Sequence, residues 1–336
     1  MTGRSLSDSA WVAAVRQFER TSGRKAAWQL ANTVVPYLLL LGSMLELARR
    51  GSPLWGLLVL PAAGFLVRAF GLFHDCVHGS FVGDARLCRI IGRSLGVLVF
   101  TPYGNWRHFH LGHHASAGDL DRRNTGDIWT LTVEEYRRGS RWQRLNYRAF
   151  RSPLVMFGLG PLTLFLFIHR LPGTRPDRRR IWSVLTTNLA IGTFVVAACL
   201  VFGVRAYLLV QLAVFVVGGG FGVWLFYVQH QFSPSYWARN ADWSPMRAAL
   251  EGSSYYKLPK VLQWLSANIG LHHLHHLCPR IPNYNLQACL DATPELRAKP
   301  LTFRQSLAAL KFNLWDEQAG RFVSFRDLAG ASGLAT

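Results

Sequence analysis

The sequence predicts an all-α membrane protein with four transmembrane helices. Its 336 residues are 50% hydrophobic and only 16% charged, whereas about a quarter of the residues in a soluble domain carry a charge. Four apolar runs explain this composition, and three of them contain no Asp, Glu, Lys or Arg over the roughly 20 residues that a helix needs to cross the hydrocarbon core. The runs cover residues 26–45, 51–67, 181–204 and 206–229.

Length identifies these runs as helices, because they are apolar on every face and their periodicity adds nothing. The run at 51–67 is slightly short, but apolar residues continue it to Phe73. Lys and Arg collect on the cytoplasmic side of membrane proteins. Basic residues precede the first and third runs, at Arg16, Arg20, Arg24 and Lys25 and at Arg175, Arg178, Arg179 and Arg180. We therefore expect both termini to be cytoplasmic, although Arg49 and Arg50 would then face outside.

Two further apolar stretches are not expected to span the membrane. Residues 94–106 contain 13 uncharged residues including Pro102, which is too short for a span. Residues 152–168 contain 17 and are interrupted by Pro161. We predict interfacial or re-entrant segments at both places. With four spans, the chain is then cytoplasmic after 51–67 and again after 206–229.

The net charge of +19 is also compatible with nucleic-acid binding, but the sequence contains no nucleic-acid motif and the basic residues flank the spans. No cleavable signal peptide is expected, because the first apolar run begins too late and is too long. The five cysteines include no C-x-x-C pair. We expect free thiols in a reducing compartment.

The ends of the chain carry less information. Residues 7–20 place Trp11, Val15 and Phe18 along one stripe, which predicts an amphipathic helix lying on the membrane within a cytosolic or interfacial N-terminus at 1–29. Residues 302–325 are expected to form a capped helix and a tail that pack onto a cytosolic cap. Residues 331–336 are expected to be disordered. Without a repeat or a linker, 1–336 is expected to be a single domain.

Most of the twelve histidines are gathered in short clusters. His74 and His78 are four residues apart, and residues three or four apart share a helical face. The pattern H-x-x-H-H occurs twice, at 110–114 and 272–276. Adjacent histidines diverge by about 100° on a helix, so each adjacent pair could serve two metal ions. A ligand set of imidazoles without cysteine suits iron, zinc, copper or nickel.

The clusters also resemble a known family. "HDCVH" at 74–78, "HLGHH" at 110–114 and "HHLHH" at 272–276 resemble the three histidine boxes of the integral-membrane fatty acid desaturases. Residues 101–136 and 268–286 resemble the bacterial methyl-end acyl-lipid branch, which is Δ12- or omega-6-like. The resemblance covers roughly residues 30–315 and implies a four-helix stem, a cytosolic helical cap with two irons, and a desaturase core at 30–330. The bacterial branch implies the inner membrane.

The resemblance implies a ligand set for the two non-haem irons. The ligands would be His74, His78, His110, His113, His114, His230, His272, His275 and His276. His108 and His273 break the box pattern and would be solvent-facing or neighbours of the ligands, and His169 would be interfacial. No separate catalytic side chain is assigned, because dioxygen chemistry belongs to the iron centre.

Ligating histidines usually donate their second N–H to an acceptor outside the ligand set. Asn268 lies four residues before His272 and would share its helical face, while Asp75 and Asp127 lie near the boxes. We expect Asn268 and at least one of these aspartates to be such partners. An ordinary cap or surface ion pair is the alternative for each.

The resemblance also implies a substrate and a donor. His272 stands where carboxyl-end enzymes often have Gln, and no "HPGG" haem motif occurs. A monounsaturated, lipid-linked acyl chain and an external donor, ferredoxin with its reductase, are therefore expected, with O2 as co-substrate. The alternative enzyme is a di-iron hydroxylase or ketolase of a lipid or carotenoid. A metal or haem carrier is disfavoured because no histidine lies inside a predicted span.

Overall fold

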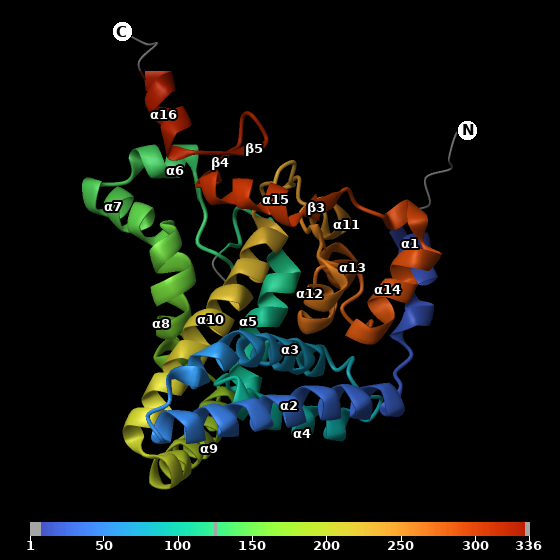
Figure 1. Cartoon of the computed structure of the whole chain (residues 1–336). Helices are drawn as coiled ribbons and strands as arrows, with labels where there is room; N and C mark the ends of the chain where they lie inside the picture. The colour runs from blue at the N-terminus through green and yellow to red at the C-terminus, as the bar shows by residue number, and fades with distance from the viewer. Residues whose placement is uncertain (1–7, 124–125, 333–336) are drawn as a thin grey trace.

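The computed structural model describes residues 8–123 and 126–332, and helices dominate it (Figure 1). The described residues contain four helices that are long and apolar enough to cross a membrane, at 23–49, 53–78, 178–202 and 204–230. These are α2 (Gly23–Arg49), η2 (Pro53–Leu58) with α3 (Val59–His78), α9 (Arg178–Phe202) and α10 (Val204–His230). The prediction of four transmembrane helices is confirmed.

Local sequence signals set the ends of these helices. Ser22 caps α2, because its Oγ accepts from the backbone N–H of Lys25. Asp177 caps α9 in the same way. Gly79 ends α3 with a φ of 71°, a left-handed conformation that favours glycine. The helices extend beyond the uncharged runs, because charged side chains at helix ends can reach out to water.

The segment at 94–106 forms the turn between α4 (Ala85–Leu98) and α5 (Tyr103–Ser116). Phe100, at the tip of this turn, packs against Phe215 of α10 with ring centroids 4.7 Å apart. The chain therefore enters the helical bundle along α4 and leaves it along α5. This hairpin agrees with the prediction that the segment does not span.

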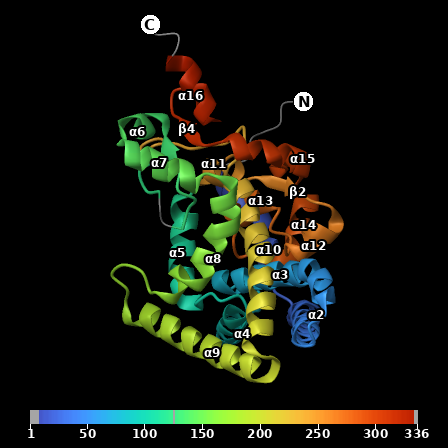
Figure 2. The same ribbon diagram turned by 60° about the vertical axis from the view of Figure 1, so that its left-hand side comes forward.

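The segment at 152–168 belongs to a bent pair of helical segments. α7 (Arg141–Phe150) meets the run formed by η3 (Val155–Leu159), α8 (Gly160–Leu166) and η4 (Ile168–Arg170) at 63°, a geometry of either a broken span or a re-entrant loop. Just before the run, Arg151 donates to Gln231, next to His230. Ten residues after it, Arg180 of α9 donates to Asn105, in the first turn of α5. α8 runs beside α10 in Figure 2.

A cap of short elements packs on α3 and on the upper part of α10, on the far side of the molecule from α9 (Figure 1). Its helices are α6 (Val133–Arg138), α11 (Pro245–Leu250), α12 (Lys260–Leu265), α13 (His272–Leu277), α14 (Asn283–Ala292), η5 (Pro294–Leu296), α15 (Phe303–Ser306), η6 (Leu307–Lys311) and α16 (Phe325–Ser332). Most have six to ten residues, so packing rather than intrinsic helix stability must hold them.

Two small sheets connect segments of the cap. Neither sheet was predicted from the sequence. β1 (Leu131–Thr132), β4 (Leu314–Asp316) and β5 (Arg321–Val323) form one sheet in the order β1-β4-β5, with β1 parallel and β5 antiparallel to β4. β2 (Tyr255–Lys257) pairs in parallel with β3 (Pro300–Thr302). Strands of two or three residues are too short to show an alternating pattern.

The N-terminal segment packs on protein rather than on lipid. α1 (Asp8–Arg16) and η1 (Gln17–Glu19) hold Val15 fully buried against Leu271 and Leu274, with Trp11 and Phe18 packed on the same cluster. The prediction that this stripe lies on the membrane is therefore wrong. An amphipathic face fits a neighbouring protein surface as well as a lipid surface, and sequence periodicity does not distinguish them.

The C-terminal region is partly as predicted. Thr302 and Gln305 form a capping box at α15, as expected for a capped helix. The β4–β5 hairpin then takes the place of the expected tail. α16 continues to Ser332, two residues into the stretch 331–336 that is predicted to be disordered, and disorder there stays a prediction. Residues 333–336 lie outside the described residues.

Candidate metal centre

Four helices carry the nine histidines that the sequence analysis singled out. His74 and His78 occupy the last turns of α3, and His230 is the last residue of α10. The second box lies on α5, and the third lies on α13, a helix of only six residues. The ends of two long helices therefore meet one cap helix and the returning arm of the α4–α5 hairpin.

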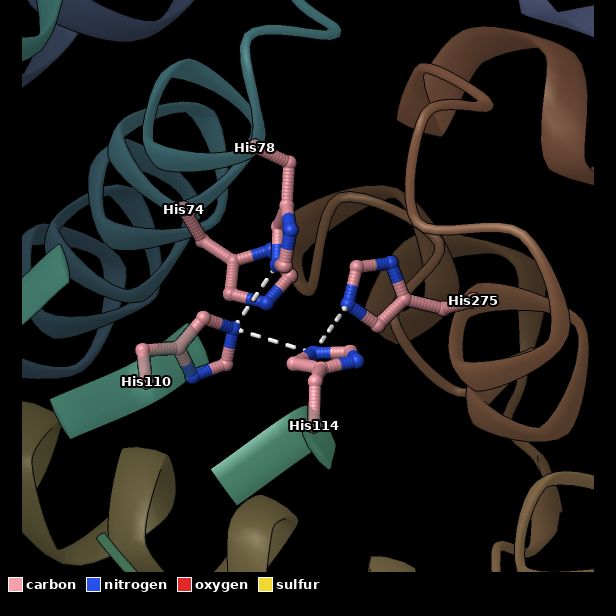
Figure 3. A group of neighbouring side chains, drawn as sticks. All are labelled: His74, His78, His110, His114 and His275. Atoms are coloured by element: carbon pink, nitrogen blue, oxygen red, sulfur yellow. Dashed lines mark hydrogen bonds between the residues drawn. The ribbon is translucent and has the colours of Figure 1, made fainter. Parts of the chain in front are cut away.

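The nine side chains form two groups, which we call site A and site B. The nitrogen atoms within each group lie within 4.8 Å of one another. Site A contains His74, His78, His110, His114 and His275, and site B contains His113, His230, His272 and His276. Figure 3 shows the site A rings pointing toward a common centre from three elements. The adjacent pairs 113–114 and 275–276 are each divided between the two sites, as their divergence on a helix predicts.

The spacing of the ring nitrogens suits metal ions. In site A, Nε2 of His110 lies 2.8 Å from Nε2 of His78 and 3.2 Å from Nε2 of His114. In site B, Nε2 of His230 lies 3.1 Å from Nε2 of His113 and 2.9 Å from Nε2 of His272. A metal–nitrogen bond of about 2.1 Å places ligands at right angles about 3 Å apart. The donor atoms are therefore spaced as ligands around shared cations would be.

Burial keeps five of the histidines outside the four spans neutral. It lowers the pKa of His110, His114, His272, His275 and His276 well below the usual range, and the neighbouring histidines lower these pKa values further. Neutral imidazole is the form that binds a metal. Within the described part of the chain, Nε2 of His276 is buried without a hydrogen-bond partner, which leaves its lone pair free for a ligand bond.

Two contacts from residues outside the ligand set orient the rings of His113 and His110. Oδ1 of Asp127 lies 2.5 Å from Nδ1 of His113, a hydrogen bond that aims Nε2 at site B. The indole of Trp106 stacks on the ring of His110, with centroids 4.3 Å apart and an interplanar angle of 13°. Asp127 was predicted from the sequence as a partner of a ligating histidine. Trp106 was not predicted, although it lies one helical turn before His110.

Asp75 and Asn268 contact the centre less directly. Oδ1 of Asp75 is 3.8 Å from Nδ1 of His74, beyond hydrogen-bond distance. Asn268 has a left-handed φ of 58° and lies before α13, so the prediction that it shares a helical face with His272 is wrong. Within the described part of the chain, the hydrogen bond of its side chain goes to the carbonyl of Asn283, and none goes to a histidine.

The other three histidines lie outside both groups. His108 is exposed. His273 is fully buried. His169 is buried rather than interfacial, and its Nδ1 lies 3.3 Å from Oγ1 of Thr101. His169 of η4 packs against Phe165 and the turn at Thr101, and the spacing of the histidines in the sequence does not reveal these contacts.

A family model described as fatty acid desaturase matches residues 51–306, a segment that contains all nine histidines. The chain belongs to the fatty acid desaturase family. Desaturases of this family are O2-dependent oxidoreductases, so the chain is a membrane enzyme of that class.

Relatives with curated names agree with this membership. A "fatty acid desaturase" of Bacillus subtilis is 46% identical over 93% of this chain and 89% of its own length. An "sn-1 oleoyl-lipid 12-desaturase" of Synechocystis is 28% identical over 66% of this chain and 63% of its own length. A Synechocystis "sn-1 acyl-lipid omega-3 desaturase (ferredoxin)" is 29% identical over 66% and 62%, respectively.

Proposed function

We propose that sites A and B each hold one iron ion and that this desaturase introduces a cis double bond into a monounsaturated acyl chain of a membrane glycerolipid. The observation that carries the proposal is the division of nine imidazoles, six of them buried and three half-buried, into two groups with ligand spacing. Bound iron would supply the O2 chemistry that breaks an unactivated C–H bond, which side chains by themselves do not.

The residues around the two irons would bind the metal ions and orient the ligating rings. The five site A histidines and the four site B histidines would supply neutral nitrogen ligands. Asp127 would accept a hydrogen bond from Nδ1–H of His113 and so fix the tautomer of that ring. A cavity of about 10 Å³ touches His230 and is lined by Phe226, Ile128 and Trp237 among others; this is room for one water-sized molecule. Its mostly apolar wall would limit the water that reaches site B.

The proposed product carries its new double bond nearer the methyl end. Resemblance of the boxes to methyl-end enzymes supports this choice. So does the relation to a Synechocystis protein named as a 12-desaturase of an oleoyl lipid. We propose reduced ferredoxin as the electron donor, since one relative carries ferredoxin in its name. The net charge of +19 suits an acidic donor through electrostatic steering.

We further propose that the protein lies in a bacterial inner membrane with both termini and all three boxes on the cytoplasmic side. Four spans return the chain to the side on which it began, so His78 and His230 end on the same face. The basic residues before α2 and α9 support the cytoplasmic assignment of that face. The whole chain would act as one desaturase unit, with its core at 30–330.

The test is a fatty-acid profile. The chain is expressed with a ferredoxin and its reductase in a bacterium rich in monounsaturated lipids, beside His275→Ala as control. We expect a diunsaturated acid that is absent from the control, with its bond position located by mass spectrometry. A hydroxylated acid would place the protein with the oxygen-inserting enzymes instead. Absence of iron from the purified protein would refute the di-iron site.

A further inference from the structure

Asn283, the first residue of α14, lies at the junction of segments that build site A. Its side chain is 1% exposed. Its backbone N–H and its Nδ2 both donate to Oδ2 of Asp75, at 2.7 and 2.8 Å. Asp75 follows His74 directly on α3, which also carries His78. The end of the first-box helix is therefore bonded to a cap helix that lies 208 residues away in the chain.

The other polar atoms of Asn283 reach two more segments. Oδ1 accepts from Nε2 of Gln29 on α2 at 2.8 Å, and Nδ2 also donates to Oε1 of Gln29 at 3.0 Å. The backbone carbonyl accepts from Nδ2 of Asn268 at 2.9 Å, in the turn just before α13. One residue thus uses its N–H, carbonyl and both amide atoms to join α2, α3 and the approach to the third box.

The bond to Asp75 has a clear electrostatic reason. The carboxylate is 3% exposed, and no Lys or Arg of the described residues forms an ion pair with it. A buried carboxylate without a cation must be stabilised by hydrogen bonds. Asn283 donates two of them to a single oxygen, so moving α14 away from α3 would leave this charge poorly solvated.

Separation of α14 from α3 is expected to affect site A. His74 comes from α3 and His275 from α13, and their rings lie 4.4 Å apart. Asn283 follows His275 by eight residues and is bonded to both sides of this contact, through Asp75 and through Asn268. Site B takes no histidine from α3. A loosened link between α3 and α14 would therefore disturb site A and spare site B.

We propose that Asn283 is a positioning residue for site A, which holds the first-box helix against the third box through Asp75. This inference rests on the proposed function, because it assigns the role relative to a bound iron. It adds a residue that lies outside the boxes. Among the described residues, its side chain and backbone form hydrogen bonds with Gln29, Asp75 and Asn268 and with none of the nine histidines.

The first measurement is the iron content of purified full-length Asn283→Ala beside wild type. We expect about two irons per chain in wild type and about one in the variant. The matched control is Asn285→Ala on the same helix, whose side chain bonds Lys25 and the carbonyls of Phe18 and Arg20 but not Asp75. This control is expected to keep two irons. Equal loss in both variants would show general destabilisation of α14 and overturn the inference.

The second measurement uses a variant in which Asp75 and Asn283 exchange residue types. The double variant Asp75→Asn with Asn283→Asp restores an amide–carboxylate hydrogen bond in the opposite sense. We expect it to regain iron above the level of either single variant. Iron that stays at the single-variant level would show that this bond does not hold site A. If wild type itself binds no iron, the proposed function fails; if wild type and Asn283→Ala both bind two irons, only this inference fails.

Discussion

At the scale of single residues, the hydrogen bond between Asp127 and His113 is the clearest support of a metal ligand from outside the ligand set. The 2.5 Å contact fixes the proton on Nδ1 and turns Nε2 toward His230. Loss of such an acceptor costs about 10–100-fold in metal affinity or activity in other metal sites.

We therefore predict that Asp127→Asn lowers desaturase activity by about 10–100-fold, with weakened iron binding at site B. The measurement is product formation together with iron titration of the metal-free protein. Asp121→Asn is the control, since Asp121 lies on the surface and pairs with Arg239, itself paired with Glu317. Surface pairs of this kind contribute little. Equal losses in the two variants would contradict the role given to Asp127.

The histidines outside the four spans predict a pH dependence for the metal-free protein. Burial lowers the folded-state pKa of His110, His114 and His275 well below the unfolded value of about 6.5. Below that pH the unfolded chain takes up protons that the folded chain refuses, so acid favours unfolding. The stability from the neutral rings is complete above about pH 6.5 and is lost as the pH falls toward the folded-state pKa.

We predict that the melting temperature of chelated protein is steady from about pH 7 to 8 and falls toward pH 5. Differential scanning fluorimetry across this range is the measurement. The iron-loaded protein should resist the fall until acid displaces the metal from the imidazoles. A melting temperature that rises toward pH 5 would contradict the buried, neutral state of these histidines.

At the scale of elements, the segment at 152–170 decides the topology. Arg151, before the segment, donates to Gln231, which follows His230, and Arg180, after it, donates to Asn105, five residues before His110. If the segment crossed the membrane, the parity of the later spans would change and His230 would lie on the opposite side from His78. The two histidines are both within the metal centre, so a re-entrant path is the consistent one.

We predict that cysteines placed at Arg50 and Thr174 are labelled from opposite sides by a membrane-impermeant maleimide. Arg50→Cys lies between the first two spans and should react only from outside. Thr174→Cys, in an exposed stretch after the segment, should react only from the cytoplasm. Wild type serves as the blank, since four of its five cysteines are buried. Labelling of Thr174→Cys from outside would mean five spans.

At the scale of the whole molecule, the metal centre joins the two hairpins of spans to the cap. Site A connects α3, α5 and α13, and site B connects α5, α10 and α13. Ligands that bind only the folded state stabilise it by mass action, by about 3–4 kcal/mol at 100 to 1,000 times the dissociation constant.

Chelation of iron should therefore lower the melting temperature by on the order of 10 °C. Thermal unfolding of the purified protein before and after chelation measures this difference. His275→Ala, which removes one site A ligand, should show a smaller difference than wild type. An unchanged melting temperature on metal removal would show that the centre does not hold the hairpins and the cap together.

The four spans, the three boxes and the division of the box histidines into two groups could all be predicted from the sequence. Twenty-residue apolar runs have one stable form in a bilayer, because backbone groups must be hydrogen-bonded within the segment. The H-x-x-H-H spacing fixes the divergence of adjacent rings, and therefore the division of the pairs 113–114 and 275–276 between two sites. Both are local properties, which a sequence carries directly.

Contacts between segments that lie far apart in the sequence could be seen in the tertiary structure alone. Spacing gave no sign that Asn283 would bond Asp75, that Val15 would be buried against Leu274, or that His169 would meet Thr101. Each contact joins segments far apart in sequence, and an amphipathic face or a polar side chain does not specify its partner. Even Asn268, four residues before His272, was misplaced, because a left-handed turn broke the helix that the spacing assumed. These contacts depend on how the cap packs, including its strands of two and three residues.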